Sequence, residues 1–300
     1  MRVVVALGGN ALLRRGEPLT EETQQRNVNL AAQAIASIAR EHNVIVTHGN
    51  GPQVGLLALE SEAYKEVPPY GLDVLGAESQ GMIGFFLEQA LRNALPDRSV
   101  ATLLTSVLVD AGDPAFSHPT KFVGPAYCWD AASELAKARG WLIAPDGKSY
   151  RRVVPSPEPR AILELPAIDA LVHAGVLTIC AGGGGVPVIR KPDGSLEGVE
   201  GVIDKDLTSA LLAEQLEAGF LLLLTDVANV QTGWGTPDAR PIGKTTSAEL
   251  RALEFAAGSM RPKVEAACRF VERTGGIAAI GALTDAEAIL RQEAGTIVTR

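Results

Sequence analysis

Short apolar runs that each end in a glycine-rich or polar turn recur along this 300-residue chain. The five clearest runs cover residues 2–7, 44–47, 176–181, 220–224 and 277–280. Strands that are apolar at nearly every position are typical of a parallel sheet, because helices cover both of its faces. A sixth run, residues 100–109, is longer, and we expect it to form a strand with an extended exit.

Helical periodicity fills the segments between these runs. Residues 27–39, 207–216 and 264–271 carry apolar side chains at the i, i+3, i+4 and i+7 spacing of an amphipathic helix. Two Thr/Glu pairs have the spacing of a capping box at a helix start: Thr246 with Glu249 and Thr284 with Glu287. Strands that alternate with helices predict an α/β fold, here a three-layer α/β/α sandwich with an open, mainly parallel central sheet.

Residues 111–159 interrupt this alternation. The segment is rich in proline and glycine and contains Trp129 and Trp141, so we expect an inserted small subdomain that protrudes from the sheet. No Ser- or Pro-rich linker marks independently folding domains. We expect a division of the chain into two halves, residues 1–205 and residues 206–300.

Composition excludes several classes of protein. Hydrophobic residues make up 46% and charged residues 21% of the chain, as in a well-packed globular protein. The formal net charge of −8, with no basic run, argues against nucleic acids and anionic membranes as partners. The first apolar run is too short for a signal peptide, and no run approaches the roughly 20 residues of a membrane span.

Cysteine and histidine form no metal or redox motif. Cys128, Cys180 and Cys268 include no C-x-x-C pair, and the four histidines show no metal-ligand spacing. We therefore expect no metal site made by the protein alone. A reducing cytoplasm is the simplest compartment for such a chain.

Three of the turns are rich in glycine and carry polar residues: residues 8–10, 48–51 and 182–185. Turns at the carboxyl ends of parallel strands are where α/β sheets bind ligands, and exposed N–H groups there attract anions. Glycine in any one of them could simply permit a tight turn, but three together indicate a polyanionic ligand. The chain has neither the G-x-x-x-x-G-K-[ST] loop nor a G-x-G-x-x-G fingerprint, which disfavours a P-loop NTPase and a nicotinamide dehydrogenase.

Two lysines stand near predicted helix starts. Lys205 lies between Asp204 and Asp206, which suit helix N-caps, and Lys263 follows a proline. A lysine in the first turn opposes the helix dipole. This placement is favourable if the lysine and the helix N-terminus face an anion, and we expect both lysines to face phosphate rather than carboxylates.

Together these segments closely resemble carbamate kinases, of the amino acid kinase family. The matching segments are residues 4–11, 48–55, 119–121, 153–157, 182–185, 202–206, 258–260 and 262–263. Other members of the family usually carry a lysine on the first strand, where this chain has Ala6. Carbamate kinases supply the corresponding cation, Lys121 in this chain, from the inserted subdomain.

The resemblance implies reversible phosphoryl transfer, ATP + carbamate = ADP + carbamoyl phosphate, run toward ATP in arginine catabolism. It implies a carbamate-binding half, residues 1–205, and a nucleotide-binding half, residues 206–300. It also implies a cytoplasmic homodimer and Mg²⁺ that arrives with ATP or ADP.

Roles for individual residues follow from the same resemblance. The catalytic residues would be Lys121, Lys205, Asp204 and Lys263, with Asp204 orienting the lysines. Phosphoryl and carbamate binding would fall to Gly8, Gly9, Asn10, Gly49, Asn50, Gly51, Gly182 and Gly183. Nucleotide binding would fall to Thr225, Asp226, Met260 and Lys263.

Some features depart from the family pattern, and other readings stay open. Phe122 follows Lys121 where many relatives have proline, and residues 226–231 lack an aspartate and a tyrosine that relatives often carry. A kinase of the same superfamily with another acceptor and a non-catalytic nucleotide-binding regulator are the main alternatives. We expect the segment 111–159 to be mobile and to close over carbamoyl phosphate, delivering Lys121.

Overall fold

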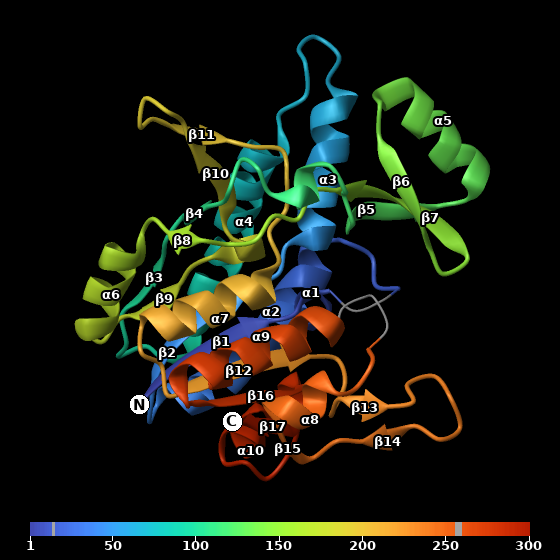
Figure 1. Ribbon diagram of the computed structural model, residues 1–300. Coiled ribbons are helices and arrows are strands. Elements are labelled where there is room, and N and C mark those ends of the chain that lie inside the picture. The colour runs from blue at the N-terminus through green and yellow to red at the C-terminus, as the bar shows by residue number, and fades with distance from the viewer. Residues whose placement is uncertain (14–15, 256–259) are drawn as a thin grey trace.

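An eight-stranded sheet lies at the centre of the molecule between layers of helices (Figure 1). The computed structural model describes residues 1–13, 16–255 and 260–300, with only the backbone of residues 10 and 11. In spatial order the strands are β15 (Lys244–Thr246), β17 (Thr296–Thr299), β16 (Ile277–Ala282), β12 (Phe220–Thr225), β1 (Arg2–Leu7), β2 (Asn43–His48), β9 (Leu177–Ile179) and β3 (Val100–Thr102). Neighbouring strands run parallel apart from the antiparallel pair β16–β17, which confirms the predicted α/β sandwich.

Helices cover both faces of this sheet. One face carries α2 (Glu21–Ala39), α4 (Leu72–Ala94) and α10 (Ala286–Leu290). The other carries α6 (Leu165–His173), α7 (Lys205–Gln215), α8 (Ser247–Arg251) and α9 (Met260–Thr274). Two further helices, α1 (Gly9–Leu12) and α3 (Gly51–Ala63), begin where β1 and β2 end. No helix in the described ranges is both long enough and apolar enough to cross a bilayer.

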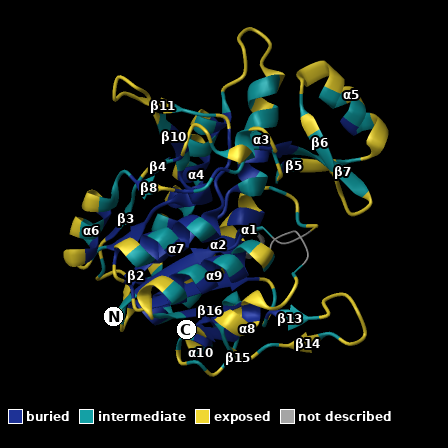
Figure 2. Cartoon of the chain, in the orientation of Figure 1, coloured by how far each residue is buried: buried dark blue, intermediate teal, exposed yellow. Residues whose placement is uncertain are grey.

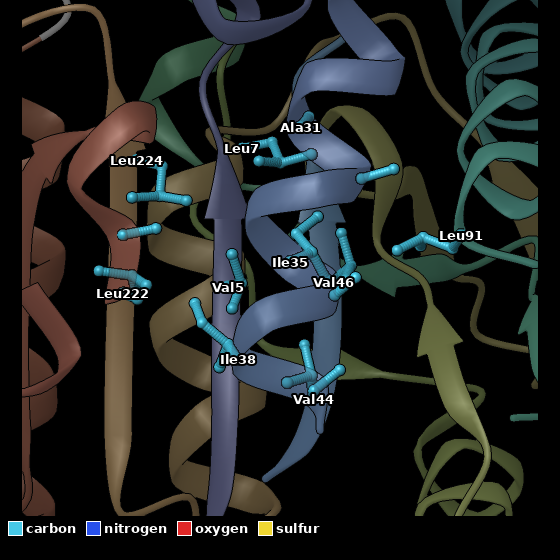
Figure 3. Close-up of a cluster of buried hydrophobic side chains, with 14 of the residues drawn as sticks. Val5, Leu7, Ala31, Ile35, Ile38, Val44, Val46, Leu91, Leu222 and Leu224 are labelled. Atoms are coloured by element: carbon cyan, nitrogen blue, oxygen red, sulfur yellow. The ribbon is translucent and has the colours of Figure 1, made fainter. Parts of the chain in front are cut away.

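Alternate residues of the central strands build two separate cores. In β1, Val5 and Leu7 face the α2 side, whereas Val4 and Ala6 face the α7 side. Figure 3 shows the first core, where Val5 and Leu7 pack beside Leu222 and Leu224 of β12 and against α2. Each fully buried Val, Leu or Ile side chain contributes about 1.5–3 kcal/mol of transfer free energy, so these cores fix the strand ends that carry the site.

Helix starts follow side-chain caps that the apolar periodicity does not show. α2 begins six residues before the predicted segment because the Thr20 hydroxyl accepts a hydrogen bond from Thr23 N at 3.3 Å. The predicted capping box of Thr246 and Glu249 is confirmed at α8. The one predicted for Thr284 and Glu287 is wrong, because Thr284 lies in a short 3₁₀ helix (Leu283–Asp285).

The predicted strand over residues 100–109 is divided between two sheets. Its first part is β3, at the edge of the main sheet, and its second part is β4 (Ser106–Leu108). The chain leaves the main sheet because Thr105 N donates to the side-chain amide oxygen of Gln80, on α4, at 2.9 Å. β4 instead joins a four-stranded sheet with β8 (Ala161–Ile162), β10 (Val186–Arg190) and β11 (Leu196–Gly198).

A small three-stranded sheet projects from the main body within residues 111–159 (Figure 1). Its strands are β5 (Lys121–Tyr127), β6 (Leu142–Asp146) and β7 (Ser149–Val154), and α5 (Trp129–Arg139) packs on it. Figure 2 shows the central strands buried and this subdomain mostly exposed or of intermediate burial. It meets the body where Gly55 of α3 lies against Gly124 of β5; a Cβ atom on Gly55 would be 2.5 Å from the Gly124 Cα.

Aromatic contacts hold the subdomain together. Trp129 packs edge-on against Tyr150, with ring centroids 4.9 Å apart. Trp141 lies beside the guanidinium groups of Arg139 and Arg152, at 4.9 and 5.0 Å from the ring centroid. Farther along the chain, β13 (Gln231–Thr232) and β14 (Arg240–Pro241) form a hairpin at the lower right of Figure 1.

Candidate active site

The carboxyl ends of β1, β2 and β12 meet at one edge of the main sheet. Leu7, the last residue of β1, lies opposite Leu224 of β12 and His48 of β2. Backbone hydrogen bonds join the turns that follow: Gly8 N donates to Leu224 O at 2.9 Å, and Gly49 N donates to Leu7 O at 3.0 Å. The glycine turns after β1 and β2 therefore lie side by side, next to the end of β12.

The third glycine turn packs directly on the turn after β2. A Cβ atom on Gly182 would lie 2.5 Å from the His48 ring, and one on Gly183 would overlap the side-chain amide of Asn50. Gly183 has a φ of +65°, which favours glycine. Asn50 is held in turn by a hydrogen bond from its Nδ2 to Ser79 Oγ at 2.8 Å. Glycine is therefore required here by close packing as well as by backbone conformation.

The other residues expected to bind substrate lie at the same edge. Gly9 begins α1, and Gly51 begins α3. A Cβ atom on Gly49 would be 2.9 Å from Gly9 N and 3.4 Å from Lys205 Cε, so the two turns and this lysine are in contact. The side chain of Asn10 lies outside the described part of the structure.

Three lysines and two aspartates converge at the start of α7. Asp204 caps the helix: its Oδ1 accepts hydrogen bonds from Asp206 N at 2.9 Å and Leu207 N at 3.4 Å. Its Oδ2 accepts one from Lys121 Nζ at 2.6 Å. Asp206 bonds to Lys205 through Oδ1 and to Lys263 Nζ through Oδ2, the latter at 2.9 Å. All but Lys121 are buried, and one positive charge is left in excess.

This arrangement corrects two sequence expectations. Lys205 and Lys263 were expected to face phosphate rather than carboxylates, but both bond to Asp206. Asp204 was expected to orient the lysines, but among them it bonds only to Lys121. From the sequence, Asp206 was expected only to suit a helix cap. Its place in the first turn of α7, next to Lys205, is the sequence feature that could have indicated its bonds to Lys205 and Lys263.

Burial and mutual attraction set the charges of this cluster. Burial alone would raise the pKa of Asp206, but the ammonium groups of Lys205 and Lys263 outweigh it and hold that pKa below its usual range. The pKa of Asp204 is lowered in the same way, with Lys121 as the strongest cation. Burial lowers the pKa of Lys205 to about 8, although Asp206 opposes this. For Lys263 the attraction of Asp206 prevails over burial and raises the pKa.

The residues expected to bind nucleotide lie on two elements. Thr225 ends β12 and is buried, and its hydroxyl donates to Asp226 Oδ1 at 3.1 Å. Met260 begins α9 and packs, half-buried, against the α7-side core. Gly258 and Ser259, which belong to the motif that precedes Lys263, lie outside the described residues.

His48 is a buried neutral side chain. Burial lowers the pKa of its imidazole to about 4, and Nδ1 lies 3.1 Å from Gly49 O. Its ring also forms the surface on which Gly182 packs. Such an imidazole is uncharged at neutral pH and only a weak base, so the structure supports a packing role over an acid or base role.

Phe122 and Lys121 lie at the start of β5. Phe122 packs under the Arg151 guanidinium, 5.5 Å from the ring centroid, so the departure from proline places an aromatic ring inside the subdomain.

Among the described residues, no three His, Cys, Asp or Glu side chains are placed to hold a metal ion.

A mainly parallel sheet with glycine turns and a lysine cluster at its carboxyl edge is the framework of a phosphoryl-transfer enzyme. The chain belongs to the amino acid kinase family, whose model matches residues 1–280, and it is a phosphotransferase.

It is 57% identical to a carbamate kinase of Rhizobium meliloti (strain 1021), over all of this chain and 93% of that one. It superposes on a carbamate kinase from Giardia lamblia bound to citric acid with a TM-score of 0.94 and 40% identity, covering 99% of this chain and 98% of that one. The same Giardia enzyme bound to AMP-PNP gives a TM-score of 0.90 at 41% identity, with the same coverage. The expected resemblance to carbamate kinases is thereby confirmed.

Proposed function

We propose that this protein is a carbamate kinase that transfers a phosphoryl group reversibly between ATP and carbamate. The observation that carries the proposal is the cluster of Lys121, Lys205 and Lys263, held by two aspartates where the glycine turns of β1 and β2 meet. As the resemblance implies, we propose that the reaction runs toward ATP in arginine catabolism, in the cytoplasm.

Carbamate is already an anion, so the reaction needs positive charge and positioning more than a base. Lys121 and Lys205 would neutralise oxygens of the moving phosphoryl group, and Lys263 would hold the terminal phosphates of the nucleotide. Asp204 and Asp206 keep these ammonium groups fixed before substrate arrives. The N–H groups at the starts of α1 and α3 would bind the transferred group and carbamate, with Gly182 and Gly183 closing the carbamate side.

The proposed division of labour follows the order of the chain. Residues 1–205, with the protruding subdomain, would bind carbamate and the transferred phosphoryl group. Residues 206–300 would bind the nucleotide through Thr225, Asp226, Met260 and Lys263. AMP-PNP bound to the Giardia lamblia carbamate kinase supports nucleotide binding by this fold.

Mg²⁺ is proposed to enter with the nucleotide. Asp204 and Asp206 already bond to lysines, and Mg²⁺ with nucleotides prefers phosphate oxygens and water. The residues present therefore fit an ion carried mainly by the nucleotide phosphates. When bound, Mg²⁺ would neutralise phosphate charge during transfer.

A homodimer is proposed for the assembled protein. Strand β3 ends the main sheet, and beside it Phe85 of α4 and Leu104 are 61% and 56% exposed. These side chains border a hollow of about 560 Å³, also lined by Arg92 and Thr102. An exposed apolar edge of this kind suits a second copy of the chain.

The reaction is tested by measuring ATP formed from carbamoyl phosphate, ADP and Mg²⁺ with a luminescent assay. We expect turnover that stops when Mg²⁺ is chelated and resumes when it is restored. Matched samples without carbamoyl phosphate exclude ATP made from ADP alone. If the folded protein binds ADP but forms no ATP above that background, the chain is a nucleotide-binding regulator and the proposal is wrong.

The pH dependence of kcat/KM should reflect the ionisation of Lys205, whose ammonium has a pKa of about 8. Below pH 8 the lysine is protonated, so kcat/KM for carbamoyl phosphate should be constant there. Above pH 8 it should fall about tenfold per unit toward the level of Lys205→Met, because the neutral amine no longer attracts phosphate. In kcat the decline should begin at higher pH, because bound anions favour the ammonium.

The free energy of unfolding should rise over the pH range in which kcat/KM falls. Because the folded pKa of Lys205 lies below the ordinary value of 10.5, the unfolded chain binds more protons between about pH 8 and 10.5. This group therefore makes the protein more stable as pH rises through that window, which separates lost activity from unfolding. Lys205→Arg, which stays charged, should retain a flat alkaline profile. A decline above pH 8 that persists in Lys205→Arg would assign it to another group.

A further inference from the structure

A cavity of about 640 Å³ lies between the subdomain and the connection from α3 to α4. Its walls come from the end of α3, from residues 64–70, from residues 139–142 and 152–155 of the subdomain, and from Glu200. None of the residues assigned above to catalysis or substrate binding lines it. Gly51 and Glu62 stand at opposite ends of α3, about 16 Å apart at 1.5 Å per residue, so the Glu62 end of this cavity lies away from the glycine turns, whereas its Val154 wall adjoins Lys121.

Arg152 is the guanidinium of this cavity that lacks a fixed anion, while the third cation of the lining, Lys65, donates from Nζ to the backbone oxygen of Glu62 at 2.7 Å. Arg139 forms an ion pair with Glu62, and Glu200 Oε1 accepts a hydrogen bond from Leu72 N at 3.3 Å. Within the described ranges, the Arg152 guanidinium has no ion pair and no hydrogen bond, and its contact is the Trp141 ring at 5.0 Å. Burial lowers the pKa of Arg152, although Glu200 and Glu62 act to raise it.

The stacking contact leaves the donors of Arg152 available. A guanidinium packs on an aromatic ring through its flat face, whereas its five N–H bonds lie in the plane of the group. In-plane donors match the two oxygens of a carboxylate. Beside Arg152 the wall is apolar, formed by Leu72, Leu75 and Val153, all buried. The volume is that of a typical small-molecule site.

We propose that this cavity binds a small organic carboxylate with an apolar body, whose carboxylate pairs with Arg152 and whose body lies on the apolar wall. Such a ligand would join the subdomain to α3 and α4. Val154 of β7 lies opposite Lys121 in the strand register, so a ligand that fixes β7 also fixes the strand that carries Lys121. Binding itself stands on the cavity alone; an effect on turnover rests on the proposed function.

The test uses 1-anilinonaphthalene-8-sulfonate as a fluorescent anionic probe and 1-naphthoate as its competitor. The full-length protein is saturated with ADP and Mg²⁺ so that the nucleotide site is occupied. We expect one probe per chain, displaced by 1-naphthoate at least tenfold more effectively than by neutral 1-naphthamide. Equal displacement by the two compounds, or no saturable binding, would overturn the proposal.

Two variants test the site by charge and by volume. Arg152→Met removes the cation and should weaken 1-naphthoate at least tenfold. Lys148→Met removes an equivalent charge from the exposed β6–β7 turn and should leave binding unchanged. Ala58→Leu fills part of the cavity with Arg152 intact and should also weaken binding. Should Arg152→Met fail to fold, Ala58→Leu decides, and unchanged affinity in it would contradict the proposal.

The same variants separate this proposal from the proposed function. 1-Naphthoate should change ATP formation by the unaltered protein and have at least tenfold less effect on Arg152→Met. Saturable, Arg152-dependent binding in a protein that makes no ATP would confirm the site while refuting the kinase assignment. ATP formation without such binding would support the kinase assignment and refute the proposed carboxylate site.

Discussion

Lys121→Ala is expected to lower kcat by about 10²–10³-fold, the usual effect of removing one preorganised electrostatic stabiliser. The affinity for ADP should change less than about twofold, because Lys121 comes from the subdomain, whereas the nucleotide is assigned to residues 206–300. Lys121 Nζ lies 2.6 Å from Asp204, which positions it over the start of α7. Steady-state kinetics and an ADP titration measure the two quantities separately.

Lys148→Met is the matched control, since it removes a lysine from the same subdomain away from the site. It should retain normal turnover. Amide exchange over residues 111–159 should slow when both substrates are bound, if the subdomain closes as expected. If Lys121→Ala loses ADP affinity in proportion to kcat, the lysine binds nucleotide and this role is wrong.

Asp206→Asn should destabilise the fold by about 3–5 kcal/mol, the usual cost of removing one partner of a buried charge pair. The substitution keeps the shape of the side chain but leaves Lys205 and Lys263 buried without a shared anion. We also expect kcat/KM to fall by about 10²-fold or more, because both ammonium groups lose their fixed position. Urea unfolding at pH 7 measures the first effect.

Asp204→Asn provides the comparison. Its amide oxygen can still cap α7, and the ion pair it loses involves Lys121, whose side chain is 32% exposed. Its loss of stability should therefore be about 1 kcal/mol. Equal destabilisation by the two substitutions would show that Asp206 has no special part in holding the cluster.

The sequence predicted the central strands well because their burial on both faces leaves an unmistakable apolar run, as in β1 and β12. It could not predict the break in residues 100–109, because the cause is Gln80, a side chain 25 residues away from Thr105. Lys205 and Lys263 could be singled out as candidates because their helix-start contexts are local, whereas Lys121 was proposed only from the family resemblance. Their pairing with Asp206 was not predictable, because Lys263 is 57 residues from that carboxylate and only the packing of α7 on α9 joins them.

The contact between Gly55 and Gly124 shows how a residue without chemistry can adjust a catalytic distance. A glycine inside α3 costs that helix about 0.5–1 kcal/mol relative to alanine. In return the backbone of β5 sits directly on the helix, three residues from Lys121, with no room for a methyl group. Adding that methyl group would displace the strand and draw the lysine away from Asp204 without altering a single charge. Divergence at this uncharged point of contact can therefore tune the enzyme as effectively as substitution of the lysine itself.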